Sequence, residues 1–176
     1  LIFSVVVPVL LCAWGALRSA ESRLVWIARW TLIISYVGPI LWFGFWSVFG
    51  PYCRYALLFT TMGGLAVGAR RYRAATIFGC TNKKQWLLVS VWFGLAILNL
   101  WAVPDAVRAR EYQGNAVEMS FPLGSGEYAV FHGGATEALN YHFVVPAQKY
   151  ALDIIALNEW GTWASGLFPD DLSDYE

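Results

Sequence analysis

The chain has 176 residues, of which 58% are hydrophobic, and it contains ten tryptophans. Soluble domains contain about 45–50% apolar residues, so this composition argues against an ordinary soluble domain and favours a membrane protein. The net charge is zero, but residues 1–104 contain nine Lys/Arg and one acidic residue, whereas residues 105–176 contain three and eleven. We therefore expect two parts in different environments, with a boundary near Pro104.

Four apolar stretches in the first part predict membrane-spanning helices, because a bilayer core of about 30 Å needs about 20 apolar helical residues. Pro39 predicts a kink in the second stretch, and Arg29, one turn inside it, is expected to reach back towards the lipid headgroups. The last stretch contains no charged residue and is the clearest span. The predicted spans are residues 1–17, 24–49, 52–69 and 86–103.

Basic residues in the connecting loops predict the orientation of this bundle. Loops 18–23 and 70–85 together contain seven Lys/Arg, whereas the loop between them has only Arg54. Cytoplasmic loops are enriched in Lys and Arg, so we expect both basic loops in the cytoplasm and residues 105–176 outside it. We interpret the basic loop as a topology signal and expect no nucleic-acid partner.

The spans themselves contain few polar groups. No acidic residue or histidine lies deep in a span, which argues against a transporter or sensor subunit, because proton relays and ion paths usually need such groups. Asn99 is the one strongly polar residue of the last span, and we expect it to form a hydrogen bond between helices. The cysteines show no CxxC spacing and are interpreted as packing residues.

Beyond Pro104 the pattern changes to short strands. Residues 115–121 and 127–132 each alternate between apolar and polar positions and are separated by a Gly/Pro-rich turn, so we predict a hairpin. Residues 150–157 are a third strand candidate. The predicted fold is therefore a membrane α-helical bundle of about four spans (residues 1–104), followed by a partial, antiparallel β-rich extracytoplasmic domain (residues 105–176). Three strands bury little apolar surface, and we expect the sequence to be a fragment cut at both ends.

His142 and Asp153 are the candidate metal ligands. A carboxylate in an apolar strand is costly to bury unless it is paired or bound to a cation, and His and Asp both bind zinc. Eleven residues apart, however, they match no compact local motif, so a capped turn and a solvated carboxylate remain the alternative. His132 lies on the predicted strand face of Tyr128 and Val130, and we interpret it as a half-buried strand residue.

A resemblance to a known family supports the interpretation of His142 and Asp153 as metal ligands. The stretch 133–175 resembles the entry segment of membrane-attached peptidases of the M23 (lysostaphin/LytM-like) type, in which N-Y-H is followed by Q-[KR]-[YW]-A-x-D. The resemblance covers roughly residues 115–176. The matching residues are Asn140, Tyr141, His142, Gln148, Lys149, Tyr150, Ala151 and Asp153.

The resemblance implies a zinc-dependent endopeptidase of the bacterial inner membrane that cuts cell-wall (peptidoglycan) peptides, with His142 and Asp153 as zinc ligands. Two departures matter. The family places its first His four residues before the Asp, where this chain has Lys149, and the later H-x-H of the family does not occur. The catalytic residues are therefore expected beyond Glu176, and the fragment itself is expected to be inactive. The alternative is a non-enzymatic membrane protein whose β-domain binds a partner or is a degenerate peptidase fold.

Overall fold

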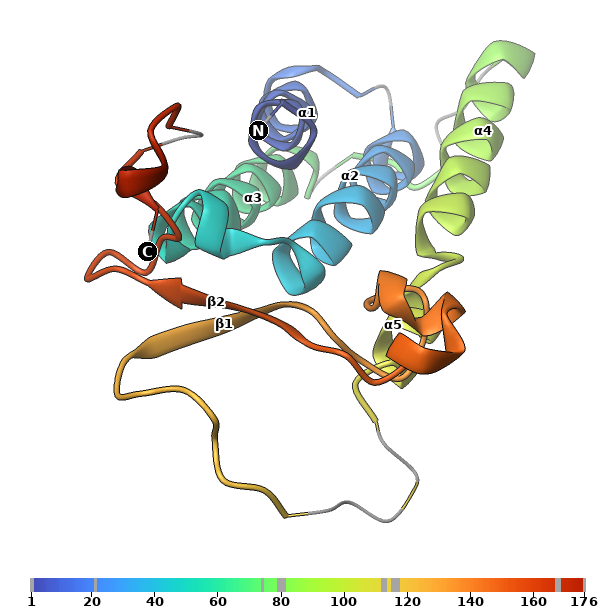
Figure 1. The fold of residues 1–176 in the computed structure, drawn as a ribbon. Coiled ribbons are helices and arrows are strands. Elements are labelled where there is room, and N and C mark those ends of the chain that lie inside the picture. Colours follow the sequence, from blue (N-terminus) through green and yellow to red (C-terminus); the bar gives the residue numbers. More distant parts are fainter. Residues whose placement is uncertain are drawn as a thin grey trace. The chain divides into compact units, whose positions relative to one another are not determined.

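The computed structural model describes residues 2–20, 22–73, 75–78, 82–111, 114, 118–166 and 169–175. The chain divides into two compact units. The first consists of Leu1–Gly44 and Tyr52–Trp101, and the second of Phe45–Pro51 and Ala102–Glu176. The units separate at Trp101, three residues before Pro104, where the charge composition changes. Each unit is described by itself below (Figure 1).

The first unit is helical. A short π-helical turn, Ile2–Val6, leads into α1. The main helices are α1 (Val7–Leu17), α2 (Arg23–Phe43), α3 (Pro51–Tyr72) and α4 (Lys83–Leu100). Within this unit α2 packs against α1 and, more extensively, against α4.

Side-chain caps determine where two of these helices begin. The Ser22 hydroxyl accepts a hydrogen bond from the Val25 amide at 3.3 Å, and the Asn82 side chain accepts one from Gln85 at 3.0 Å. Ser and Asn are favoured N-caps because they satisfy amides that have no partner inside the helix. Helix α2 continues through Pro39 and ends at Phe43, before the extended Gly44. The helix is therefore six residues shorter at this end than the predicted span 24–49.

The core of the first unit lies around Trp30 of α2, which is 2% exposed. Glycines allow the neighbouring helices to approach it. A Cβ placed on Gly64 of α3 would lie 2.9 Å from the Trp30 ring, and one on Gly15 of α1 would lie 2.5 Å from Ile33. Asn99 of α4 donates to the Ser35 hydroxyl of α2 at 3.2 Å, which confirms the expected hydrogen bond between helices.

Two helices of the described chain, not four, are long and apolar enough to cross a membrane: Arg23–Phe43 and Lys83–Arg108, the latter formed by α4 and the following α5 (Val103–Arg108). The first and third of the four predicted spans do not meet these requirements. The first apolar helix, Ile2–Leu17, is too short. Helix α3 is long enough, but Arg54, the Thr60–Thr61 pair and Arg70 lower its hydropathy.

The second unit contains a two-stranded antiparallel sheet, β1 (Glu127–His132) and β2 (Asp153–Leu157). In Figure 1 the two strands lie side by side. The predicted hairpin is wrong, because β1 pairs with β2 and residues 118–121 form no strand; residues 115–117 lie outside the described residues. A bulge between Val130 and His132 ends the regular ladder and pairs His132 with Asp153.

Aromatic side chains attach the segment Phe45–Pro51 to this sheet. The Phe45 ring stacks on Phe131 of β1 at 4.5 Å between centroids, and Phe131 stacks on Trp163 at 5.9 Å. The Trp163 amide donates to the Ser47 carbonyl at 3.1 Å. Stacked aromatic pairs contribute about 0.5–1.5 kcal/mol beyond the area they bury. Residues predicted as the end of a membrane span thus belong to the second unit.

Candidate functional site

His142 and Asp153 meet in the second unit. The His142 Nε2 atom lies 2.9 Å from Asp153 Oδ1. The His142 side chain is 12% exposed and the Asp153 side chain 36% exposed, so the carboxylate remains open to solvent. The two residues are eleven positions apart in the sequence, and the structure brings their side chains into direct contact.

Asn140 determines the path of the chain around this pair. It is 1% exposed, and its side-chain amide donates to the carbonyls of Gly134, Lys149 and Ala151 at 3.1–3.3 Å. Its side-chain oxygen accepts from the His142 amide at 3.1 Å and caps the 3₁₀ turn Tyr141–Val144. A buried amide bonded on both sides holds His142 against the segment that leads into β2.

Gln148 orients the imidazole from its other side. His142 Nδ1 lies 3.3 Å from Gln148 Oε1, and Nε2 faces a carboxylate. Because both partners accept hydrogen bonds, the arrangement favours the doubly protonated ring. The hydrogen bond with Asp153 accordingly raises the pKa of His142, and the same bond lowers the pKa of Asp153. Burial opposes both changes without reversing them.

An aromatic wall supports the imidazole. The Tyr141 ring lies over His142 with 4.0 Å between centroids, and His132 contacts the edge of Tyr141 at 4.7 Å. Phe45 in turn contacts His132 at 5.5 Å. His132 is half-buried in β1, as the sequence indicated. Its position next to Asp153 follows from the bulge, which breaks the regular alternation from which its face was predicted.

The separation of the His142 nitrogen and the Asp153 oxygen is close to that of two ligands on one zinc ion. In a tetrahedral zinc site a histidine nitrogen and a carboxylate oxygen lie about 2.0–2.2 Å from the metal, which places them roughly 3.3 Å apart. The observed 2.9 Å is within a small rotamer adjustment of that separation. Gln148 on Nδ1 is the kind of outer partner that orients a metal-bound histidine. His142 and Asp153 could therefore serve as two of the three protein ligands that a catalytic zinc site requires.

No group of three or more His, Cys, Asp and Glu side chains is assembled among the described residues. His132 does not complete the set, although its charge contributes to the lowered pKa of Asp153. A third ligand must therefore come from outside the described residues if the pair binds zinc.

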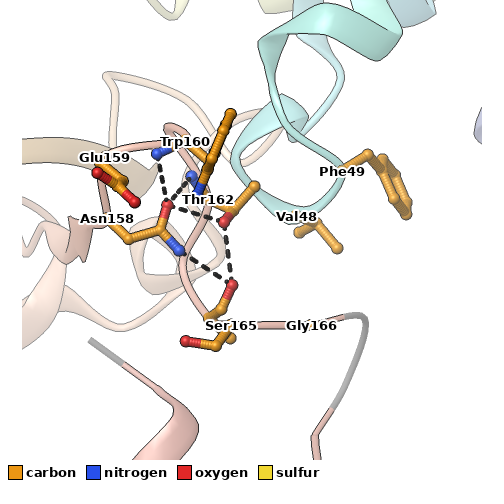
Figure 2. A pocket seen from close by; sticks show the side chains of 9 residues that line it. Val48, Phe49, Asn158, Glu159, Trp160, Thr162, Ser165 and Gly166 are labelled. Atoms are coloured by element: carbon orange, nitrogen blue, oxygen red, sulfur yellow. Dashed lines mark hydrogen bonds between the residues drawn. The ribbon is translucent and has the colours of Figure 1, made fainter.

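A separate pocket lies at the other end of β2. It has a volume of about 630 Å³ and is bordered by Val48, Phe49 and the loop 158–166. Figure 2 shows the Asn158 side chain bonded within this loop: its oxygen accepts from the Trp160 amide at 3.0 Å and the Thr162 amide at 3.1 Å. Trp160 is 64% exposed, whereas Trp163 belongs to the aromatic stack on β1. The five residues of β2, at about 3.4 Å each, separate this pocket from Asp153 by roughly 17 Å.

Sequence reasoning missed the roles of Asn140 and Gln148 as positioning residues. The signal was present, because both lie in the N-Y-H and Q-K-Y-A-x-D stretches on which the resemblance rests. An Asn directly before a predicted turn is also a known sign of a local cap. Asn140, however, bonds to backbone carbonyls up to eleven residues away, and Gln148 bonds to the His142 ring six residues away. Nothing in the sequence identifies those partners.

Comparison of the chain with protein-family models, with curated protein sequences and with solved structures found no match.

Proposed function

We propose that this chain is the membrane-attached N-terminal part of a zinc-dependent endopeptidase of the M23 type that acts on cell-wall peptides. The observation that carries the proposal is the contact between His142 Nε2 and Asp153 Oδ1 at 2.9 Å. The resemblance implied that these residues share a metal, and they converge although Lys149 occupies the usual place of the histidine. In this assignment His142 reaches the site from a 3₁₀ turn and Asp153 from the start of β2.

Membrane attachment is supported by the surface of α4. Only 11% of the apolar window in Lys83–Arg108 is buried within the protein. Exposed apolar patches of this extent mark contact with a partner or a membrane, and a helix that is apolar on all sides is typical of a membrane span. The exposed large side chains of α4 are Trp86, Leu87, Leu88, Val91, Leu95, Ile97, Leu98 and Leu100.

In this proposal, side chains of this chain would bind the metal and orient its ligands. His142 would bind the metal through Nε2 while Gln148 holds Nδ1, and Asp153 would bind through its exposed carboxylate. When bound, zinc supplies a Lewis acid that polarises a carbonyl and lowers the pKa of water. Because His142 must lose its Nε2 proton first, acidification is expected to weaken zinc binding.

Zinc binding to the full chain in detergent tests the proposal. Calorimetric titration should show one zinc ion bound per chain, with the weak affinity expected of two ligands. Loss of an outer partner costs roughly 10–100-fold in metal affinity, so Gln148→Ala should weaken binding within that range. His142→Ala and Asp153→Asn, which remove ligands, should weaken it more.

Two variants are matched controls. His132→Phe removes the other imidazole and keeps a ring against Tyr141, and Asp105→Asn removes an exposed carboxylate of the same unit. Both should bind zinc like the original chain. In a longer protein that supplies H-x-H, His142→Ala should also abolish cleavage of cell-wall peptides. Equal zinc affinity in His142→Ala and His132→Phe would reject the assignment.

A second candidate is a non-enzymatic membrane protein in which the pair is only a structural ion pair. The direct 2.9 Å contact, without a third ligand among the described residues, favours it. In that case zinc should leave the histidine ring signals unchanged, and His142→Ala should reduce thermal stability without any effect of zinc.

A further inference from the structure

A cavity of about 240 Å³ opens at one end of the first unit. It lies between the loop that joins α1 to α2 and the first turns of α4, and it is much larger than the roughly 30 Å³ that one water molecule occupies. Its polar side chains include two arginines and a glutamine, and its walls include two tryptophans. The lining residues are Trp14, Arg18, Ser19, Ala20, Val25, Arg29, Gln85, Leu88 and Trp92.

Arg29 provides the buried cation of this cavity. Arg29 is 3% exposed. Its guanidinium donates to the carbonyls of Arg18 at 2.5 Å and Ser19 at 3.0 Å, just beyond the end of α1. The Trp14 and Trp92 rings lie 4.9 and 5.7 Å from the guanidinium carbon. The sequence predicts that this side chain reaches towards the lipid headgroups, but in the structure it is buried within the protein.

Among the described residues, these contacts leave the charge of Arg29 and one of its donors without compensation. Arg29 Nε is buried and has no hydrogen-bond partner among the described residues. Carbonyl dipoles and aromatic rings attract a cation but carry no net negative charge. The one acidic residue of residues 1–104, Glu21, lies outside the described residues. The described part of the first unit therefore holds no carboxylate for Arg29, and an unpaired buried charge is costly.

We propose that this cavity binds a phosphate group, carried by the headgroup of an anionic lipid or free in solution. Arg29 lies at its wall, Arg18 supplies a second guanidinium, and Gln85 borders it from α4. Basic pockets between membrane helices on the cytoplasmic side are suited to anionic headgroups, and guanidinium groups match phosphate oxygens in geometry. A lipid as the source of the phosphate depends on the membrane attachment proposed above. Binding of a phosphate group in the cavity does not depend on it.

Native mass spectrometry of the full chain, released from detergent, tests this site. With phosphatidylglycerol we expect one tightly retained lipid per chain, and with phosphatidylcholine of the same acyl chains much weaker retention. A basic side chain near a headgroup contributes about a fivefold change in affinity. Arg18→Gln should therefore weaken phosphatidylglycerol binding about fivefold while its backbone carbonyl still accepts from Arg29.

Arg54→Gln is the matched control, because it removes another exposed arginine of the first unit that does not line the cavity. It should leave lipid binding unchanged. Arg29→Lys should weaken binding if it folds, but Arg18→Gln decides the question, because Arg29 also caps α1. Equal losses in Arg18→Gln and Arg54→Gln, or equal retention of both lipids, would overturn the lipid site.

Inorganic phosphate distinguishes the two sources. If millimolar phosphate alone raises the melting temperature, and Arg18→Gln removes that effect, the cavity takes free phosphate. If neither phosphate nor phosphatidylglycerol binds, the proposal fails. Carbonate extraction of membranes tests the attachment separately: release of the chain would reject the membrane anchor, while the phosphate titration would still decide the chemistry of the cavity.

Discussion

At the residue scale, His142 and Asp153 form an acid–base pair that is partly open to solvent on the side of the carboxylate. Their mutual hydrogen bond raises the pKa of the imidazole and lowers that of the carboxyl. The contribution of a raised His pKa to stability is complete below the ordinary value of 6.5 and is lost as pH rises through the raised pKa. The contribution of a lowered Asp pKa is present above the ordinary 3.8 and is lost as pH falls through the lowered pKa. The pair therefore stabilises the unit most between these two ordinary values.

Asp153→Asn should lower the pKa of His142, because the amide cannot stabilise the imidazolium as a carboxylate does. The measurement is an NMR titration of the histidine ring signals in the full chain, with the His132→Phe background leaving a single histidine. Asp105→Asn is the control and should leave the His142 titration in place. An unchanged His142 pKa in Asp153→Asn would show that the contact is absent in solution.

At the scale of elements, glycines determine how closely the helices of the first unit pack. Gly63 and Gly64 are neighbours on α3, but only Gly64 faces another helix: its added Cβ would lie 2.9 Å from Trp30, whereas nothing lies within 4 Å of that of Gly63. Trp30 is a large and rigid buried ring, so it cannot move aside easily.

Gly64→Ala should therefore destabilise the first unit by about 1–3 kcal/mol, the usual cost of overpacking a core. Gly63→Ala, one residue away, should be neutral or stabilise α3 by up to about 1 kcal/mol, because Ala is the better helix former. Thermal unfolding followed by circular dichroism in detergent gives both values. Equal effects of the two substitutions would mean that α3 does not pack on Trp30 in this register.

At the scale of the whole molecule, the charged residues are divided between the two units. Nine of the twelve Lys/Arg lie in residues 1–104, and eleven of the twelve acidic residues lie in residues 105–176. If α4 crosses a membrane, the basic loop 70–85 that precedes it is expected in the cytoplasm and residues 105–176 outside it.

Cysteine labelling of intact cells tests this orientation in a background without native cysteines. A cysteine at Ser125 should react with an impermeant reagent, and one at Thr76, whose side chain is exposed in the basic loop, should react only after lysis. The reverse pattern would overturn the topology, and labelling of both sites in intact cells would argue against a crossing between them.

Several features of the chain depend only on neighbouring residues, and the sequence determined them. Helix α4, with Asn82 as its cap, lies close to where the apolar run predicts it. The strands β1 and β2 lie within the alternating or apolar stretches that indicated them. Periodicity and capping act over one or two turns, so they can be read without knowledge of the fold.

Only the tertiary structure decided which of these elements meet. β1 pairs with β2 across more than twenty residues, segment 45–51 joins the second unit through Phe45, and Arg29 turns to the end of α1. The contact between His142 and Asp153 depends on the hydrogen bonds of Asn140 to distant carbonyls. Such contacts depend on closing long loops and on burial shared by remote segments, and a local pattern contains no information about either.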